Sequence, residues 1–136
     1  MQAKLGPGCK TLAEQDWVMP VDATLGTWAS LRVVKEKDLL RIPGDCMPLD
    51  QLACLREQLT AYCLLEESAL KAGDALILNA ANSCTGQYVL QLCAVLRLRA
   101  VAVVGPEHTE DFEKMQLWLT ALGAAQVGGG CLAWLH

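Results

Sequence analysis

Residues 73–105 read GDALILNAANSCTGQYVLQLCAVLRLRAVAVVG, a strand–helix–strand pattern that decides the fold. Residues 75–78 and 100–104 are short apolar runs, typical of strands that are buried on both faces of a sheet. The segment between them, residues 86–98, carries one apolar face at helical spacing, made of Val89, Leu92, Cys93 and Leu96. Two buried strands joined by a single helix predict parallel pairing with a right-handed crossover.

The same pattern repeats after Gly105. Thr109 is expected to cap a second helix, whose buried face would be Phe112, Met115, Leu119 and Leu122. Gly123 is expected to end that helix, and residues 125–127 to form a third strand. Residues 73–136 are therefore predicted to be the first half of a Rossmann-like, doubly wound parallel sheet, which has about six strands when complete. The three glycines at 128–130 fit a flexible loop, but we expect them rather to mark where the pattern ends.

The first 48 residues read as β structure and predict part of a small β-barrel. Residues 17–20 are expected to form a short strand that ends at Pro20. Residues 27–34 alternate apolar and polar side chains and are predicted to form another strand, with Trp28 packed in the barrel. The fold class predicted for the whole chain is thus α/β, with a partial barrel followed by a partial parallel sheet.

Residues 49–72 are expected to connect these two parts. Apolar side chains recur at helical spacing, which predicts one helix over residues 49–65 with a buried face of Leu52, Leu55, Leu59 and Cys63. Residues 71–74 then form a tight turn. The predicted domains are residues 1–48, the connecting helix and turn at 49–72, and residues 73–136.

Composition excludes several classes of function. The 136 residues include 11 Lys and Arg against 15 Asp and Glu, and this net charge of -4 is the wrong sign for a protein that neutralises nucleic-acid phosphates. The most apolar stretch, residues 89–104, contains Gln91, Arg97 and Arg99 and is shorter than the roughly 18 residues of a membrane span. We expect a soluble protein.

Seven cysteines occur without a Cys-x-x-Cys pair, so neither a metal site nor a disulfide framework is predicted. We expect reduced thiols. No cleavable hydrophobic signal is visible at the amino end, and Glu14 and Asp16 are untypical of an organelle presequence.

The turn NAANSCTG at residues 79–86 lies where a doubly wound sheet holds ligand phosphates, at the first strand-to-helix connection. The usual G-x-G-x-x-G motif is absent. Gly86 alone is retained, at the point where the helix and the strand must approach closely. The residues by themselves fit either a dinucleotide site or a packed turn without a ligand.

Five short blocks resemble the zinc-independent medium-chain dehydrogenase/reductase superfamily, in order and spacing. They are QDWV at 15–18, GTW at 26–28, TAY at 60–62, KAGD at 71–74 and LGA at 122–124. Two segments, DATLGTW at 22–28 and NAANSCTGQ at 79–87, are most similar to the mitochondrial trans-2-enoyl-thioester reductases. The resemblance covers roughly residues 10–128 and implies that residues 1–48 belong to a GroES-like catalytic domain.

The resemblance implies NADPH-dependent reduction of enoyl thioesters, carried on acyl carrier protein or CoA, in mitochondrial fatty acid synthesis. The family's proton-donating tyrosine has no counterpart in the matched residues, so we name no catalytic residue and expect this partial chain to be inactive alone. A homodimer or the remaining part of the reductase is the expected protein partner. Two alternatives stay open: a non-catalytic fragment that acts by interaction, and a quinone oxidoreductase of the same superfamily, which fits residues 26–28 less well.

The resemblance also assigns cofactor-binding positions. The nucleotide-phosphate loop would consist of Asn82, Ser83, Cys84, Thr85 and Gly86. Glu57 falls where the family has a cofactor-contacting asparagine. The positions that contact the adenosine ribose and its 2′-phosphate would be Gly105, Pro106 and Glu107.

Three departures from the family pattern predict weak NADPH binding. Cys84 replaces a glycine, and its side chain is expected either to clash with the pyrophosphate or to strain the backbone. Gly105 replaces an arginine that would bind the 2′-phosphate through charge-assisted hydrogen bonds. Glu57 places a carboxylate where the family has a neutral amide, near an anionic cofactor.

Overall fold

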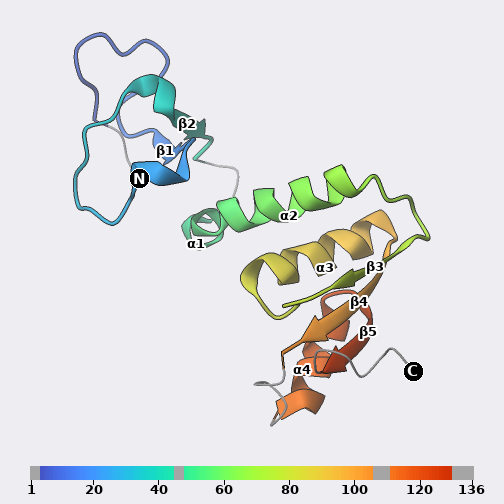
Figure 1. The fold of residues 1–136 in the computed structure, drawn as a ribbon. Helices are drawn as coiled ribbons and strands as arrows, with labels where there is room; N and C mark the ends of the chain where they lie inside the picture. The colour runs from blue at the N-terminus through green and yellow to red at the C-terminus, as the bar shows by residue number, and fades with distance from the viewer. Residues whose placement is uncertain (1–3, 45–47, 106–110, 130–136) are drawn as a thin grey trace. The chain divides into compact units, whose positions relative to one another are not determined.

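The computed structural model describes residues 4–44, 48–105 and 111–129 (Figure 1). The chain divides into two compact units, residues 1–52 and 53–136. The division into three domains that the sequence suggested stays a prediction.

The first unit is built on a two-stranded antiparallel sheet. Strand β1 (Trp17–Pro20) pairs with β2 (Leu39–Ile42), with Trp17 opposite Ile42. Two 3-10 turns, η1 (Ala23–Leu25) and η2 (Glu36–Asp38), lie between the strands. The predicted strand at residues 17–20 is confirmed, and Val18 is its buried residue.

The strand predicted for residues 27–34 is wrong. No residue of this segment belongs to a strand, and the side chains of Trp28 and Val33 are fully exposed, at 103% and 101%. An alternating pattern forms a strand only where a neighbouring strand supplies hydrogen bonds and a face to cover. In the described part of this unit β1 pairs with β2 instead, so Trp28 is not packed in a barrel.

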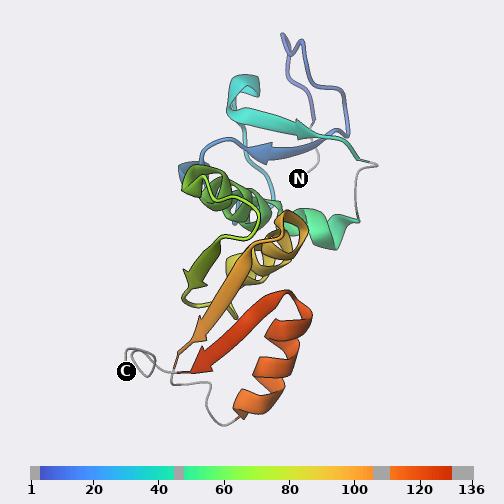
Figure 2. The same cartoon turned by 90° about the vertical axis from the view of Figure 1, so that its right-hand side faces the viewer.

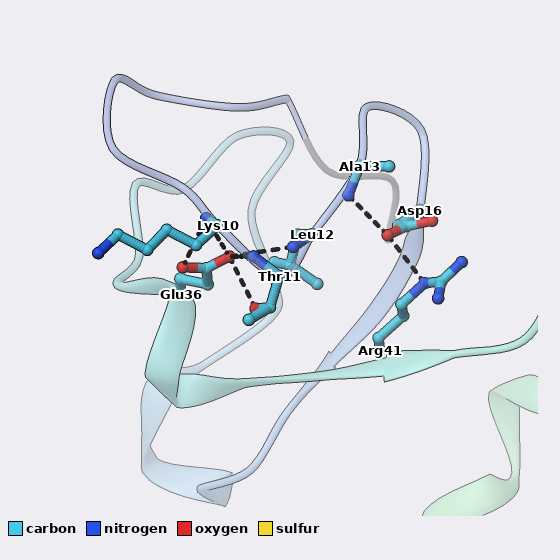
Figure 3. A network of polar contacts seen from close by, with 7 residues as sticks. All are labelled: Lys10, Thr11, Leu12, Ala13, Asp16, Glu36 and Arg41. Carbon is cyan, nitrogen blue, oxygen red and sulfur yellow. Dashed lines mark hydrogen bonds and ion pairs between the residues drawn. The ribbon is translucent and has the colours of Figure 1, made fainter.

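Polar contacts rather than apolar packing order residues 10–16 (Figure 3). One carboxylate oxygen of Glu36 accepts hydrogen bonds from the N–H groups of Lys10, Thr11 and Leu12 at 3.0, 2.6 and 3.0 Å, and from the Thr11 hydroxyl at 2.8 Å. Asp16 accepts a bond from the Ala13 N–H at 2.8 Å and pairs with Arg41 Nε at 2.9 Å. The turn that precedes β1 is thereby tied to η2 and β2.

The pKa of Glu36 provides a test of this network. Hydrogen bonds from the Thr11 N–H, first, and from the Thr11 hydroxyl and neighbouring N–H groups lower the pKa of Glu36 to about 2. Because folding lowers the pKa of Glu36, its carboxylate stabilises the folded state fully above the ordinary glutamate pKa, near 4.3. This stabilisation is lost as the pH falls towards 2. We expect the amide signals of residues 10–12 to move together with the Glu36 carboxyl signal over this range in an NMR titration. A Glu36 midpoint near 4.3 would contradict the network, and Glu36→Gln should remove the transition at residues 10–12.

The second unit contains a parallel sheet in the order β3-β4-β5 (Figures 1 and 2). The strands are β3 (Ala75–Leu78), β4 (Arg99–Val104) and β5 (Ala124–Gly129), and both neighbouring pairs are parallel. The predicted partial Rossmann-like sheet is therefore confirmed. Gly128 and Gly129 do not form a flexible loop but continue β5 beside Val103 and Val104. A side chain at Gly129 would lie 2.9 Å from the Phe112 ring, so a glycine fits there for packing reasons.

The connecting helix is interrupted, contrary to the sequence prediction. Helix α1 (Leu49–Ala53) ends before Cys54, whose φ of -96° and ψ of 9° break the helix, and α2 (Leu55–Ser68) follows. The buried face of α2 contains Ala61 and Leu65, whereas Leu59 and Cys63 are exposed. Of the predicted face, Leu52 on α1 is buried and Leu55 is half-buried. The choice of Leu59 and Cys63 is wrong because α2 packs against α3, and that neighbour selects the face with the small Ala61.

Helices α3 (Cys84–Leu96) and α4 (Phe112–Ala121) are the two crossovers, and α4 lies beside β5 in Figure 2. The fully buried larger side chains of the core are Leu90, Cys93, Val104 and Leu119. The predicted stripe of α4 is confirmed, because Phe112, Met115 and Leu122 pack against this core around Leu119. On α3, Val89 and Cys93 are buried as predicted, but Leu96 is half-exposed and the sequence missed Leu90.

Gly123 ends α4 as predicted. It has a φ of +118°, which favours glycine, and its N–H donates to the Thr120 carbonyl. A side chain at this position would lie 2.7 Å from the Leu90 carbonyl oxygen, so the same glycine lets α4 approach α3. Thr109, the predicted cap of this helix, lies outside the described residues.

Candidate functional site

The loop between β3 and α3 is fixed at the carboxyl ends of two strands. The Ala81 N–H donates to the Val103 carbonyl of β4 at 3.2 Å, and the Ser83 N–H donates to the Ala80 carbonyl at 2.9 Å. Ala80 has a φ of +49°, so this tight turn includes a left-handed residue. In open α/β sheets this edge is where ligands bind.

The amino end of α3 is capped by Ser83. The Ser83 hydroxyl accepts a hydrogen bond from the Gly86 N–H at 3.1 Å, and Gln87 Nε2 donates to the Asn82 carbonyl at 3.1 Å. Within the described residues, no acceptor is found for the N–H groups of Cys84 and Thr85. Two N–H groups at the positive end of a 13-residue helix form a favourable environment for a phosphate.

Gly86 is the point of closest approach between α3 and this loop. A Cβ atom there would lie 2.6 Å from the Ala80 carbonyl oxygen and 2.7 Å from that of Ala81. No side chain fits at these distances, which explains why glycine is retained although the other glycines of the motif are absent. The close approach expected from the sequence is confirmed.

We predict that Gly86→Ala costs about 3 kcal/mol of stability, because the added methyl group meets backbone oxygens that cannot rotate away. Urea unfolding followed by circular dichroism measures the loss. Gly73→Ala is the matched control in the same unit. Its position has open space, and the cost there is about 1 kcal/mol from its φ of +95°. Equal losses in the two variants would contradict the close approach.

Cys84 is the first residue of α3, and its side chain is exposed. It is not among the residues with positive φ, so the backbone strain considered above does not arise, because the first helical turn suits any side chain with a Cβ atom. The bulk of the thiol at the expected phosphate position stays a prediction. Burial first, and then the neighbouring Cys54 and Glu57, raise the pKa of the Cys84 thiol, so the thiol stays protonated at neutral pH.

The first turn of α2 lies against the first turn of α3. Gln58 Nε2 donates to the Tyr88 hydroxyl at 3.3 Å, and Glu57 is close enough to act on the charge of Cys84. The structure thus brings Glu57 near the loop formed by Asn82 to Gly86. Gly105 directly follows β4 and is half-buried. Pro106 and Glu107, the other expected ribose positions, lie outside the described residues.

An apolar groove that the sequence did not indicate lies between α2 and α3. Its volume is about 390 Å³, and its walls include Leu55, Leu59, Tyr62, Tyr88 and Leu92. The helical spacing of Leu55, Leu59 and Tyr62 was the signal in the sequence for an apolar groove wall, but we assigned Leu55 and Leu59 to the core.

Two further features were sought in the described ranges. No cluster of three or more His, Cys, Asp or Glu side chains suited to a metal ion is present there. Nor does any described helix have the length and apolar character needed to cross a membrane.

Comparison with known proteins gives the chain a family context. No family model matches it. It is 39% identical over 125 residues to the human mitochondrial enoyl-[acyl-carrier-protein] reductase and 36% identical to the Xenopus tropicalis protein of that name. The chain is a partial relative of the mitochondrial enoyl-thioester reductases. The match covers 90% of this chain but 33% of the human enzyme, so the chain spans about a third of the length of the relatives it matches.

Solved structures agree with this similarity. The Candida tropicalis mitochondrial 2-enoyl thioester reductase heterodimer, Etr1p/Etr2p, superposes with a TM-score of 0.82 at 25% identity, over 93% of this chain and 38% of that one. The Escherichia coli quinone oxidoreductase shares the fold, with a TM-score of 0.76 at 23% identity, over 91% of this chain and 36% of that one. The resemblance inferred from the short sequence blocks is therefore confirmed.

Proposed function

We propose that this chain supplies the nucleotide-phosphate loop of an NADPH-dependent enoyl-thioester reductase. The observation that carries the proposal is the contact of Gly86 with Ala80 and Ala81, which presents the N–H groups of Cys84 and Thr85 at the carboxyl edge of the sheet. One Candida tropicalis neighbour of this fold is described as a complex of Etr1p with NADP and crotonyl-CoA.

The backbone of the loop fits a pyrophosphate, and the side chains around it fit less well. Ser83 and Gly86 shape the helix end, and Asn82, Cys84 and Thr85 complete the proposed phosphate loop. The carboxylate of Glu57 lies near the same helix end, where it repels an anion. We propose weak NADPH binding, with Gly105, Pro106 and Glu107 at the adenosine ribose.

In the proposed reaction NADPH supplies a hydride to the β-carbon of the enoyl thioester, and a proton reaches the α-carbon. The part of this chain in that chemistry is binding and orientation: the loop holds the phosphates and fixes the position of the cofactor along the sheet edge. We assign no described residue to proton transfer. Activity itself is proposed for a protein that combines this segment with the remaining portion of the reductase fold.

The substrate, partners and location follow from the relatives. We propose trans-2-enoyl thioesters on acyl carrier protein or CoA as substrate, fatty acid synthesis as the process and the mitochondrion as the location, which the names of the relatives support. The heterodimer of the Candida tropicalis enzyme supports a partner of the same fold, either a second copy or the remainder of the reductase.

A second candidate is a non-catalytic interaction segment. The side chain of Val95 on α3 is 77% exposed and lines the same groove as Leu59 and Tyr62, which are 43% and 54% exposed. Large exposed apolar side chains that lie together are typical of surfaces that bind another protein. Quinone reduction rests on likeness of fold alone. The nucleotide experiment below separates the first candidate from the second, because an interaction segment requires no cofactor.

We predict that two substitutions improve nucleotide affinity in different ways. Cys84→Gly removes a side chain from the pyrophosphate position and should tighten NADH and NADPH by a similar factor. Gly105→Arg supplies a charge-assisted bond that only the 2′-phosphate can accept, worth about 1.5–3 kcal/mol, or roughly 10- to 100-fold for NADPH alone. Isothermal titration calorimetry of NADH and NADPH with the unaltered chain and the two variants measures the changes in affinity.

Thr85→Gly is the matched control for Cys84→Gly. It removes the neighbouring side chain of the same loop, at a position where the family pattern has no glycine. It should not reproduce the gain. If the unaltered chain binds NADPH at low micromolar Kd with a large preference over NADH, the assigned roles of Cys84 and Gly105 are wrong. If no variant binds either nucleotide, the phosphate-loop proposal fails for this chain.

A further inference from the structure

Helices α2 and α3 lie side by side and run in the same direction (Figure 1). The Gln58–Tyr88 hydrogen bond, 3.3 Å long, fixes their register. Cys54 and Cys84 each stand four residues before one of these partners, which is about one helical turn. The two cysteines therefore occupy matching positions one turn earlier along the same interface.

The spacing of the helices suits a bond between these positions. Packed helices have axes about 8–10 Å apart and a Cα radius of about 2.3 Å, so facing Cα atoms come within about 3.4–5.4 Å of one another. A disulfide needs a Cα separation of about 4.4–6.8 Å. The fully buried Ala61 on α2 favours the closer end of this range. The neighbouring Cys54 also contributes to the raised pKa of the Cys84 thiol, in keeping with this register.

The other described cysteines lack such a partner. Cys93 is buried in the core, Cys63 is on the exposed side of α2, and Cys9 belongs to the first unit. Cys84 is exposed and Cys54 is half-buried, so a small reagent can reach the pair.

We propose that Cys54 and Cys84 form a redox-active thiol pair, which closes to a disulfide when the protein meets a small disulfide oxidant such as oxidised glutathione. Because the Cys84 thiol is protonated at neutral pH, the reaction is run at mildly alkaline pH, where one thiolate of the pair attacks the glutathione disulfide, forms a mixed disulfide and releases one glutathione. The second protein thiolate then attacks the protein sulfur of that mixed disulfide, and the second glutathione leaves. Two electrons and two protons pass from the protein thiols to two glutathione molecules. This proposal does not rest on the proposed function.

The disulfide would join the start of α2 to the first residue of α3. It closes a loop across the unit that contains β3 and the phosphate loop, so it restricts the unfolded chain and should raise the midpoint of thermal unfolding. At the same time it would hold the Cys84 side chain against α2. Formation of the disulfide would thus show that α2 and α3 keep this register.

The test oxidises the purified 136-residue chain with glutathione disulfide, blocks remaining thiols with an alkylating agent and maps the linked peptides by mass spectrometry. We expect the Cys54–Cys84 link to be the dominant product, with a mass loss of about 2 Da and a rise of about 5–10 °C in the unfolding midpoint. A dominant link between any other pair, or stable glutathione adducts on both cysteines, would overturn the proposal.

Variants separate proximity in the fold from chemical reactivity. Cys54→Ser and Cys84→Ser should each abolish the link and leave a glutathione adduct on the remaining thiol. Cys63→Ser, the matched control on the same helix, should leave the yield of the link unchanged. Oxidation of the unaltered chain in 6 M guanidinium should remove the preference for the pair; a preference that persists there would show that the folded register is not its cause.

Discussion

The approach of Gly86 to the carbonyl oxygens of Ala80 and Ala81 is the constraint on which the second unit depends. Because no side chain fits in that space, α3 starts directly against the turn that leaves β3. Ser83 can then cap the helix, and the turn can bond to β4 through Ala81. The position of β4, the packing of Leu90 and Cys93, and the approach of α4 at Gly123 follow from the same placement of α3.

The local environment of the loop accounts for both its likeness to the family and its departures. The backbone geometry suits an anion, since it requires only a strand, a tight turn and a glycine on the first turn of the helix. The side chains have the opposite effect. The Cys84 thiol occupies the helix end, and Glu57 brings a carboxylate towards it. The proposed nucleotide affinity thus depends on two opposing effects: the backbone geometry favours an anion, and the side chains of Cys84 and Glu57 disfavour it.

Sequence patterns predicted the second unit well because its sheet is built from two successive strand–helix–strand segments. Each strand–helix–strand segment carries its own period, and parallel pairing follows from the connection. The prediction of a strand at residues 27–34 was wrong because a strand needs a hydrogen-bonded partner strand from elsewhere in the chain. The prediction that Leu59 and Cys63 are buried on α2 was wrong because apolar residues occur all around that helix, and packing against α3 decides which of them are buried. The nearness of Cys54 to Cys84 depends on the register of two helices, which no local pattern specifies.

The central claim is that the start of α3 binds the phosphates of a dinucleotide. Chemical-shift mapping of backbone amides during titration with NADPH, up to millimolar concentration, tests it most directly and tolerates weak binding. The account predicts that the largest shifts occur at Cys84, Thr85 and Gly86 and that inorganic pyrophosphate moves the same signals. Shifts centred on other residues, or no shifts at saturating nucleotide, would contradict it.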